Sequence, residues 1–133
     1  MTKTKAQQIM AATEARAADD VTAAIQDIAA EFEPYIIKQR RHFHKHPELS
    51  LAEERTTSDI ANQLDAMNIP YERPLKTGLV ATLRGTAPDA YRGDGTPRRR
   101  ILLRADIDAL PVTEQTGEEF SSVNEGCMHA CGH

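Results

Sequence analysis

Two cysteines and two histidines lie within the segment CMHACGH, residues 127–133. Cys131 and His133 flank Gly132, and a thiolate and an imidazole are ligands that suit zinc and similar transition metals. The glycine lets the backbone turn tightly enough for both side chains to face one ion, and His129 offers a third ligand. Because two or three local ligands do not close a tetrahedral shell, the segment predicts part of a metal site whose other ligands lie elsewhere.

A second candidate is the pair Asp106 and Asp108 in the segment LLRADIDALP. Side chains alternate along a strand, so both carboxylates are expected to project to one side, with Cα atoms roughly 7 Å apart. The C-terminal edge of a sheet is where α/β enzymes keep their sites, and two adjacent carboxylates repel unless a cation or proton lies between them. The spacing alone leaves two alternatives open, a functional pair or two carboxylates that leave the sheet into water.

A third cluster, His42, His44 and His46, alternates in RRHFHKHPEL. This alternation suggests metal binding on an extended chain, but the segment is predicted to be a helix end, where residues two apart point in different directions. The preferred interpretation is a basic helix C-terminus that interacts favourably with the helix dipole.

The composition is that of one ordinary domain: 133 residues, 40% hydrophobic and 27% charged, with 5% aromatic residues. A net charge of −4 argues against a nucleic-acid partner, and the short arginine runs at 40–41 and 98–100 are interpreted as solvated surface. No segment approaches the ~20 apolar residues that span a membrane, and the N-terminus lacks the apolar core of a signal peptide. The sequence therefore predicts a cytoplasmic protein without a membrane partner, in which a structural disulfide is not expected.

The elements that must position these residues begin with helices. Residues 1–20 are a helix-prone leader with few large apolar groups. Pro34 is expected to end the helix that follows or to open a second one, which runs to His46. The apolar residues of the first helix are spaced four, three and four apart, as on one helical face: Val21, Ile25, Ile28 and Phe32.

A further helix is predicted over 52–67, with Ser50 and Glu53 as a capping box. Strands are predicted after it at YERPL (71–75), GLVATLRG (78–85) and RILLRADIDAL (100–110), the last of them buried, with an exposed loop at 86–99. Helices followed by strands predict an α/β fold in which N-terminal helices precede the strands of a mixed sheet.

Four segments, in this order, resemble one family: RRHFHKHPELSLAEERTT, TGLVATLRG, ILLRADIDALP and GCMHACGH. They are similar to the dinuclear metal amidohydrolases of the aminoacylase and carboxypeptidase group. The most similar branch contains hippurate hydrolase, N-acyl-amino-acid amidohydrolases and the enzymes that split auxin–amino-acid conjugates. The resemblance covers roughly residues 34–133 apart from the loop.

The resemblance implies a role for three residues. Cys131 matches the cysteine that binds or bridges a metal pair, and His133 matches the next ligand. Asp108 matches the acidic residue that orients the site rather than binding directly. The implied cofactors are two divalent ions, zinc or else manganese, cobalt or nickel. Asp106 occupies a position where distant relatives place a metal-binding histidine, and His44, Pro47 and Glu48 match positions interpreted as structural.

The activity implied by the resemblance is hydrolysis of the amide bond of N-acyl amino acids by a metal-activated water, with a glutamate as general base. In the family, a Glu-Glu pair, two further ligand histidines and an inserted dimerisation domain complete the protein, which is expected to be a homodimer. Residues 21–133 are therefore expected to be the N-terminal part of a catalytic domain with a zinc-peptidase-like fold. As such a fragment, they are expected not to hydrolyse amides alone.

Other functions stay open at this point. Within the same chemistry, the protein is alternatively an exopeptidase, a dipeptidase or a deacetylase of an N-acetylated diamino acid. From a different class, it is a non-catalytic, truncated binding module. A small redox or structural-zinc protein that uses Cys127 and Cys131 is disfavoured, because their spacing is not that of a C-x-x-C motif.

Overall fold

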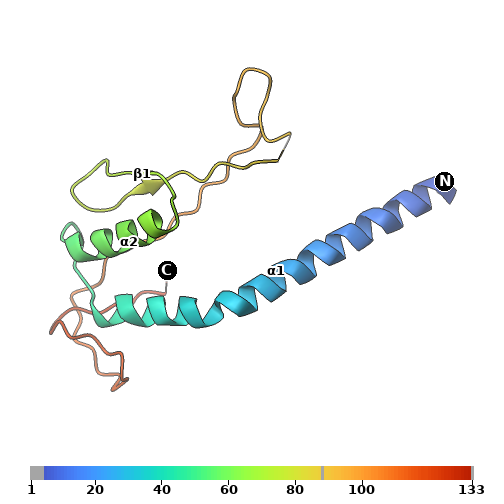
Figure 1. Ribbon diagram of the computed structural model, residues 1–133. Coiled ribbons are helices and arrows are strands. Elements are labelled where there is room, and N and C mark those ends of the chain that lie inside the picture. Colours follow the sequence, from blue (N-terminus) through green and yellow to red (C-terminus); the bar gives the residue numbers. More distant parts are fainter. Residues whose placement is uncertain (1–4, 88, 133) are drawn as a thin grey trace. The chain divides into compact units, whose positions relative to one another are not determined.

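The computed structural model describes residues 5–87 and 89–132 (Figure 1). Its elements follow the predicted order, helices first: α1 (Lys5–Lys45), α2 (Glu54–Ala66), β1 (Tyr71–Glu72) and β2 (Val80–Ala81). The chain divides into two compact units, residues 1–40 and 41–133. This arrangement of two helices and a small sheet agrees with the predicted α/β class.

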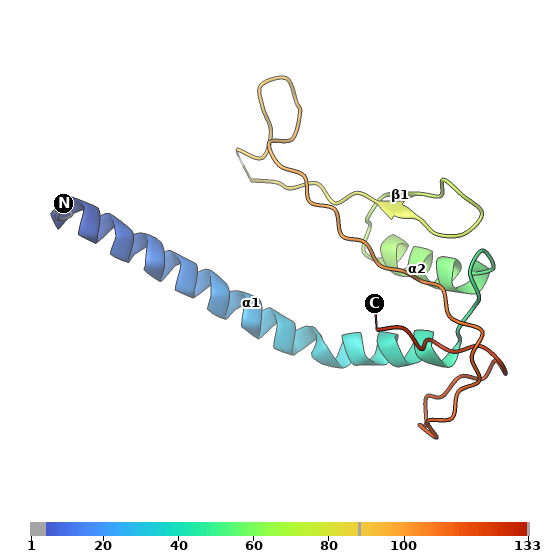
Figure 2. The ribbon, with the colours of Figure 1, turned by 180° about the vertical axis from the view of Figure 1, so that it is seen from behind.

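The helix α1 continues through Pro34, so the predicted break there is wrong (Figure 2). A proline inside a helix removes one N–H donor and displaces the carbonyl four residues earlier. All side chains from Asp20 to Lys38 are exposed, so water can satisfy the carbonyl that loses its donor. The predicted apolar face is present, and its residues Val21, Ile25, Ile28 and Phe32 are each more than half exposed.

The helix α2 begins at Glu54, and the predicted capping box is wrong. Glu53 is the N-cap residue and makes no side-chain cap hydrogen bond. The carboxylate of Glu48 replaces it, accepting hydrogen bonds from the backbone N–H of Arg55 at 3.1 Å and of Thr56 at 2.7 Å. A negative charge at this position also interacts favourably with the positive end of the helix dipole.

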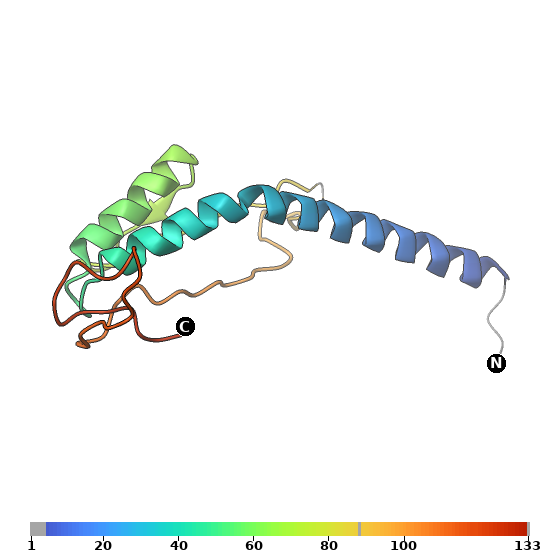
Figure 3. The same ribbon diagram turned by 90° about the horizontal axis from the view of Figure 1, so that it is seen from below.

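The two strands form an antiparallel pair in which Tyr71 lies opposite Ala81 and Glu72 opposite Val80. The turn between them is fixed to α2, because the Gly78 N–H donates to Thr57 Oγ1 at 2.9 Å and Thr57 is buried. The helix α2 lies beside the last turn of α1, where His42 contacts Asp59 (Figure 3).

The third predicted strand is not formed over 101–108. Ile101, Leu102 and Leu103 are 86–91% exposed, so the expectation that they are buried is wrong. No strand within residues 5–87 and 89–132 pairs with this run, and an apolar pattern alone does not bury a strand. The part that follows is ordered differently: Ala109 makes a parallel bridge with Leu49, and Leu110 an antiparallel bridge with Met128. Neither of the described helices has the length and hydropathy needed to span a bilayer.

Candidate metal centre

Backbone hydrogen bonds bring the aspartate segment and the cysteine–histidine segment together. Leu110 and Met128 exchange two of them, at 2.9 and 3.0 Å. The N–H of Ala109 donates to the carbonyl of Glu48 at 2.8 Å, and Ala109 is 4% exposed. These bonds place residues 106–108 next to residues 129–131, although about 20 residues separate them in the sequence.

Four of the candidate side chains line one pocket of about 200 Å³: Asp106, Asp108, His129 and Cys131. The two aspartates therefore share a site, as their spacing predicted, and Asp106 also pairs with the guanidinium of Arg104. The third predicted site residue, His133, lies outside the described residues.

His129, which the sequence offers as a third metal ligand, also lines the pocket. Its Nε2 atom is buried and has no hydrogen-bond partner in the part of the chain that the structure describes. Burial lowers the pKa of His129, and the nearby His44 lowers it further, against the opposing effect of Asp108. A neutral imidazole with an unused nitrogen is a good metal ligand. The sequence signal was its position two residues before Cys131.

The donor types around the pocket fit a transition metal: two carboxylates, an imidazole and a thiol. Among residues 5–87 and 89–132, no three such side chains are placed closely enough to hold one ion. The described residues therefore do not form a complete ligand shell by themselves.

A buried hydrogen-bonded pair, His44 and Glu114, holds the polypeptide that leads into this pocket. His44 Nε2 donates to Glu114 Oε1 at 3.0 Å, and the two side chains are 13% and 4% exposed. Glu114 also accepts hydrogen bonds from the Thr116 hydroxyl and from the backbone N–H of Ser122, the latter at 2.6 Å. The bond from Thr116, followed by those from His44 and Ser122, lowers the pKa of Glu114 to about 2. The carboxylate is thus charged at neutral pH, and three donors fix its position.

Two further bonds attach the same region to the end of α1. The N–H of Val123 donates to the carbonyl of Lys45 at 2.9 Å, and Asn124 Nδ2 donates to the carbonyl of Pro47 at 2.7 Å. Pro47 is fully buried and Cys127 is 7% exposed. The segment 122–128 is therefore anchored at both ends, and the residues that follow it enter the pocket from a fixed position. No motif marks Glu114 or Asn124, because His44 and Pro47, their respective partners, lie 70 and 77 residues earlier in the chain.

The three alternating histidines do not contact a common side chain. His42 pairs with Asp59 at 2.8 Å, His44 with Glu114, and His46 has a buried Nδ1 atom without a partner in the described residues. Their contacts agree with the structural interpretation of this helix end. The contacts of Pro47 and Glu48 agree with it as well.

The two cysteines differ in their surroundings. Cys127 is buried and Cys131 is exposed, and neither is in a disulfide. Burial and the charge of Glu48 raise the pKa of Cys127, which keeps it a thiol at neutral pH. The metal-ligand thiolate is therefore expected at Cys131, which lines the pocket.

Residues 102–133 match the model of peptidase family M20/M25/M40, and these residues include every side chain that lines the pocket. This part of the chain is therefore similar to the M20 peptidases. An uncharacterized hydrolase from Staphylococcus epidermidis is 46% identical over 99 residues, which is 74% of this chain and 23% of that relative. An uncharacterized hydrolase from Staphylococcus aureus is 44% identical over 99 residues, again 74% of this chain and 23% of the relative. The chain thus spans about a quarter of the length of the curated relatives that it matches.

Two solved structures resemble the fold. The YxeP protein of Bacillus subtilis, described as a dinuclear metal binding peptidase from the M20 family, is 42% identical with a TM-score of 0.65. The matched part is 77% of this chain and 27% of YxeP. A protein from methicillin-resistant Staphylococcus aureus is 36% identical with a TM-score of 0.66, over 80% of this chain and 26% of its own. The similarity to an M20 peptidase therefore extends from the sequence to the fold, and the α/β class is confirmed.

Proposed function

We propose that the protein containing this chain is a metal-dependent hydrolase that cleaves the amide bond of N-acyl amino acids. The observation that carries this proposal is the pocket in which two carboxylates, an imidazole and an exposed thiol meet within an M20 segment. The hydrolase names of the relatives support the reaction class. The N-acyl amino acid rests on the resemblance of the four motifs, and the homodimer expected for the full-length protein is proposed on the same basis.

In this proposal Cys131 and His133 hold metal, and Asp108 orients the site. Bound divalent ions, zinc or else manganese, cobalt or nickel, would supply an activated water and polarise the scissile carbonyl. Two ions per site are proposed because YxeP is described as binding a dinuclear metal. The carboxylates of Asp106 and Asp108 make the pocket attractive to cations before any metal is bound.

Asp108 is suited to a positioning role, because it interacts with His129 and not with solvent alone. Its charge and a backbone hydrogen bond at Asp108 raise the pKa of His129 against the effect of burial. The backbone bond fixes the orientation of the ring, and the charge of the Asp108 carboxylate acts on the imidazole beside it.

The test is an assay of the protein expressed from its complete coding sequence. N-benzoylglycine, N-acetyl amino acids and dipeptides are supplied as substrates, with and without a chelator, and zinc or manganese is then added back. We expect turnover of the N-acyl amino acids that the chelator abolishes and the metal restores.

Variants assign the role of Asp108 in the same assay. Loss of an orienting carboxylate lowers activity or metal affinity about 10- to 100-fold, so Asp108→Asn is expected to do so. An exposed residue of α1 gives a matched control, Asp27→Asn, which should have no effect. Chelator-resistant turnover would contradict the proposal, whereas faster cleavage of dipeptides would replace the substrate class with that of a dipeptidase.

A further inference from the structure

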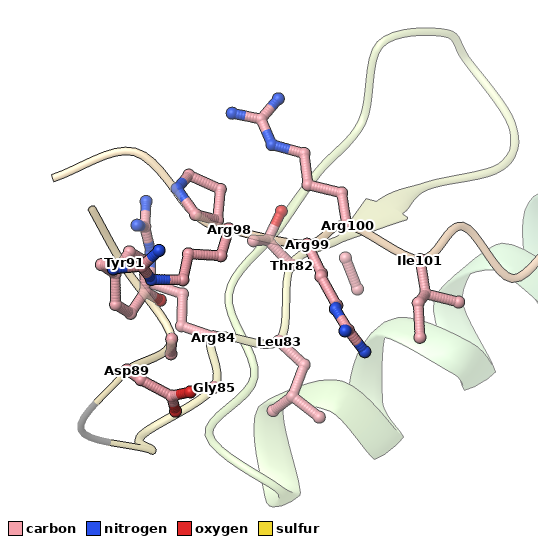
Figure 4. A pocket seen from close by; sticks show the side chains of 13 residues that line it. Thr82, Leu83, Arg84, Gly85, Asp89, Tyr91, Arg98, Arg99, Arg100 and Ile101 are labelled. Carbon is pink, nitrogen blue, oxygen red and sulfur yellow. The ribbon is translucent and has the colours of Figure 1, made fainter. Parts of the chain in front are cut away.

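A second, larger pocket of about 780 Å³ lies between residues 81–85 and 97–101 (Figure 4). It shares no lining residue with the metal centre. Four arginines contribute to its lining: Arg84, Arg98, Arg99 and Arg100. The run 98–100 is exposed, as its interpretation as solvated surface predicts, and it lies across a hollow from Arg84.

The positive charge of this pocket is not neutralised. Within the described ranges 5–87 and 89–132, none of its four arginines forms an ion pair, whereas Arg55 and Arg104 both do. Asp89 is the one acidic residue in the lining. Four guanidinium groups against one carboxylate produce a local positive field on a chain whose net charge is −4.

Two of the arginines lie on the Tyr91 side of the pocket. In Figure 4, Arg84 and Arg98 are on this side, while Arg99 and Arg100 leave the chain in opposite directions. The backbone on this side is held by hydrogen bonds, from Arg98 N–H to the Ala90 carbonyl at 2.9 Å and from Arg92 N–H to the Thr96 carbonyl at 2.8 Å. Tyr91 also makes an antiparallel bridge with Pro97, and both are half-buried. Arg98 is therefore carried by a small closed hairpin and not by an extended tail.

We propose that this pocket binds the phosphate group of a small phosphorylated molecule between Arg84 and Arg98. Guanidinium groups recognise phosphate oxygens through paired, charge-assisted hydrogen bonds, which are stronger than neutral ones. Tyr91 provides a ring at the side of the pocket against which the organic part of such a molecule packs. A small ligand is favoured over a nucleic acid because the chain is acidic overall and these four arginines line one hollow.

The probes are inorganic phosphate and pyrophosphate, titrated calorimetrically into the complete protein at low ionic strength. The protein is first stripped of metal with a chelator and dialysed, so that phosphate cannot bind through metal ions. The variants are the double substitution Arg84→Gln with Arg98→Gln, and Arg73→Gln as a matched control. Arg73 is an exposed arginine that stacks on Tyr71 outside the pocket. Circular dichroism checks that each variant is folded.

The expected result is saturable binding of pyrophosphate by the wild type, tighter than that of phosphate. The dissociation constant should rise about tenfold or more in the double variant and stay unchanged in Arg73→Gln, because charge-assisted bonds contribute that much to affinity. No saturable binding by the metal-free wild type would overturn the proposal. An equal loss of pyrophosphate affinity in both variants would also overturn it, because it would show a general charge effect. Strong binding of a single-stranded oligonucleotide, retained by the double variant, would overturn it as well.

Discussion

The two halves of the segment RILLRADIDAL have opposite environments. Ile101, Leu102 and Leu103 form the continuous apolar run of the segment and are 86–91% exposed, without a strand partner in the described residues. Asp108 and Ala109 are less apolar, yet Ala109 is buried and its backbone is bonded to Glu48. The candidate metal centre lies in the second half.

This difference shows what orders the site. The pocket is not positioned by burial of the apolar run before it, because that run is exposed. It is positioned by backbone bonds to the loop after α1 and by the buried pair of Glu114 and His44, which fixes the returning chain. Polar groups at such sites are held firmly only when every one of them is bonded, and Glu114 has three donors.

The strongest test of this comparison removes the buried carboxylate. Glu114→Ala leaves His44 without its partner and the Ser122 N–H without an acceptor. Removal of one member of a buried pair is severely destabilising, so we expect the melting temperature to fall on the order of 10 °C. Differential scanning calorimetry of the complete protein measures it, with the exposed Glu119→Ala as a matched control. Equal melting temperatures for the two variants would show that the pair does not hold the site.

Acid should weaken the same anchor in a defined range. The pKa of Glu114 is lowered from an ordinary 4.5 to about 2, so the folded state keeps the charge where the unfolded chain takes up a proton. Its contribution to stability is complete above pH about 4.5 and is lost as the pH falls towards about 2. Urea unfolding over this range should show a steeper loss of stability for the wild type than for Glu114→Gln. Parallel curves would contradict the assignment.

Removal of the cap of α2 should have a smaller effect on stability. It also distinguishes the observed cap, Glu48, from the predicted capping residue, Ser50. Glu48→Ala removes the acceptor of two backbone N–H groups and should cost about 1 kcal/mol, as is typical of a lost cap. Ser50→Ala removes the hydroxyl of the capping box that does not form, and should leave stability unchanged. Chemical denaturation midpoints decide between them. A larger loss of stability in Ser50→Ala than in Glu48→Ala would show that the capping box forms.

The smallest effect is expected in the exposed half of the segment. Leu102 is 86% exposed, so Leu102→Ser should change the free energy of unfolding by no more than about 0.5 kcal/mol. The measurement is the urea midpoint of the complete protein. A loss as large as that of Glu114→Ala would show that another part of the protein buries this run.

Much of the fold and of the site followed from the sequence, and the reasons differ between residues. Periodicity predicted the helices and the cores of the first two strands, because both are local properties. The spacing of Asp106 and Asp108 predicted carboxylates on one side of a strand; both line one pocket, although no strand forms there. The cap by Glu48, the continuity of α1 through Pro34 and the bond from His44 to Glu114 could not be predicted in this way. Each depends on solvent exposure or on partners that are distant in the sequence, which no local pattern records.

If Cys131 belongs to a metal centre, the amount of metal bound to the purified protein depends on this residue. The complete protein and its Cys131→Ser variant would be purified in parallel and measured by inductively coupled plasma mass spectrometry, with Cys127→Ser as the matched control. We expect bound divalent metal in the wild type and in the Cys127→Ser variant, and a marked loss of bound metal in the Cys131→Ser variant. Equal metal content in all three proteins, or none in the wild type, would contradict it.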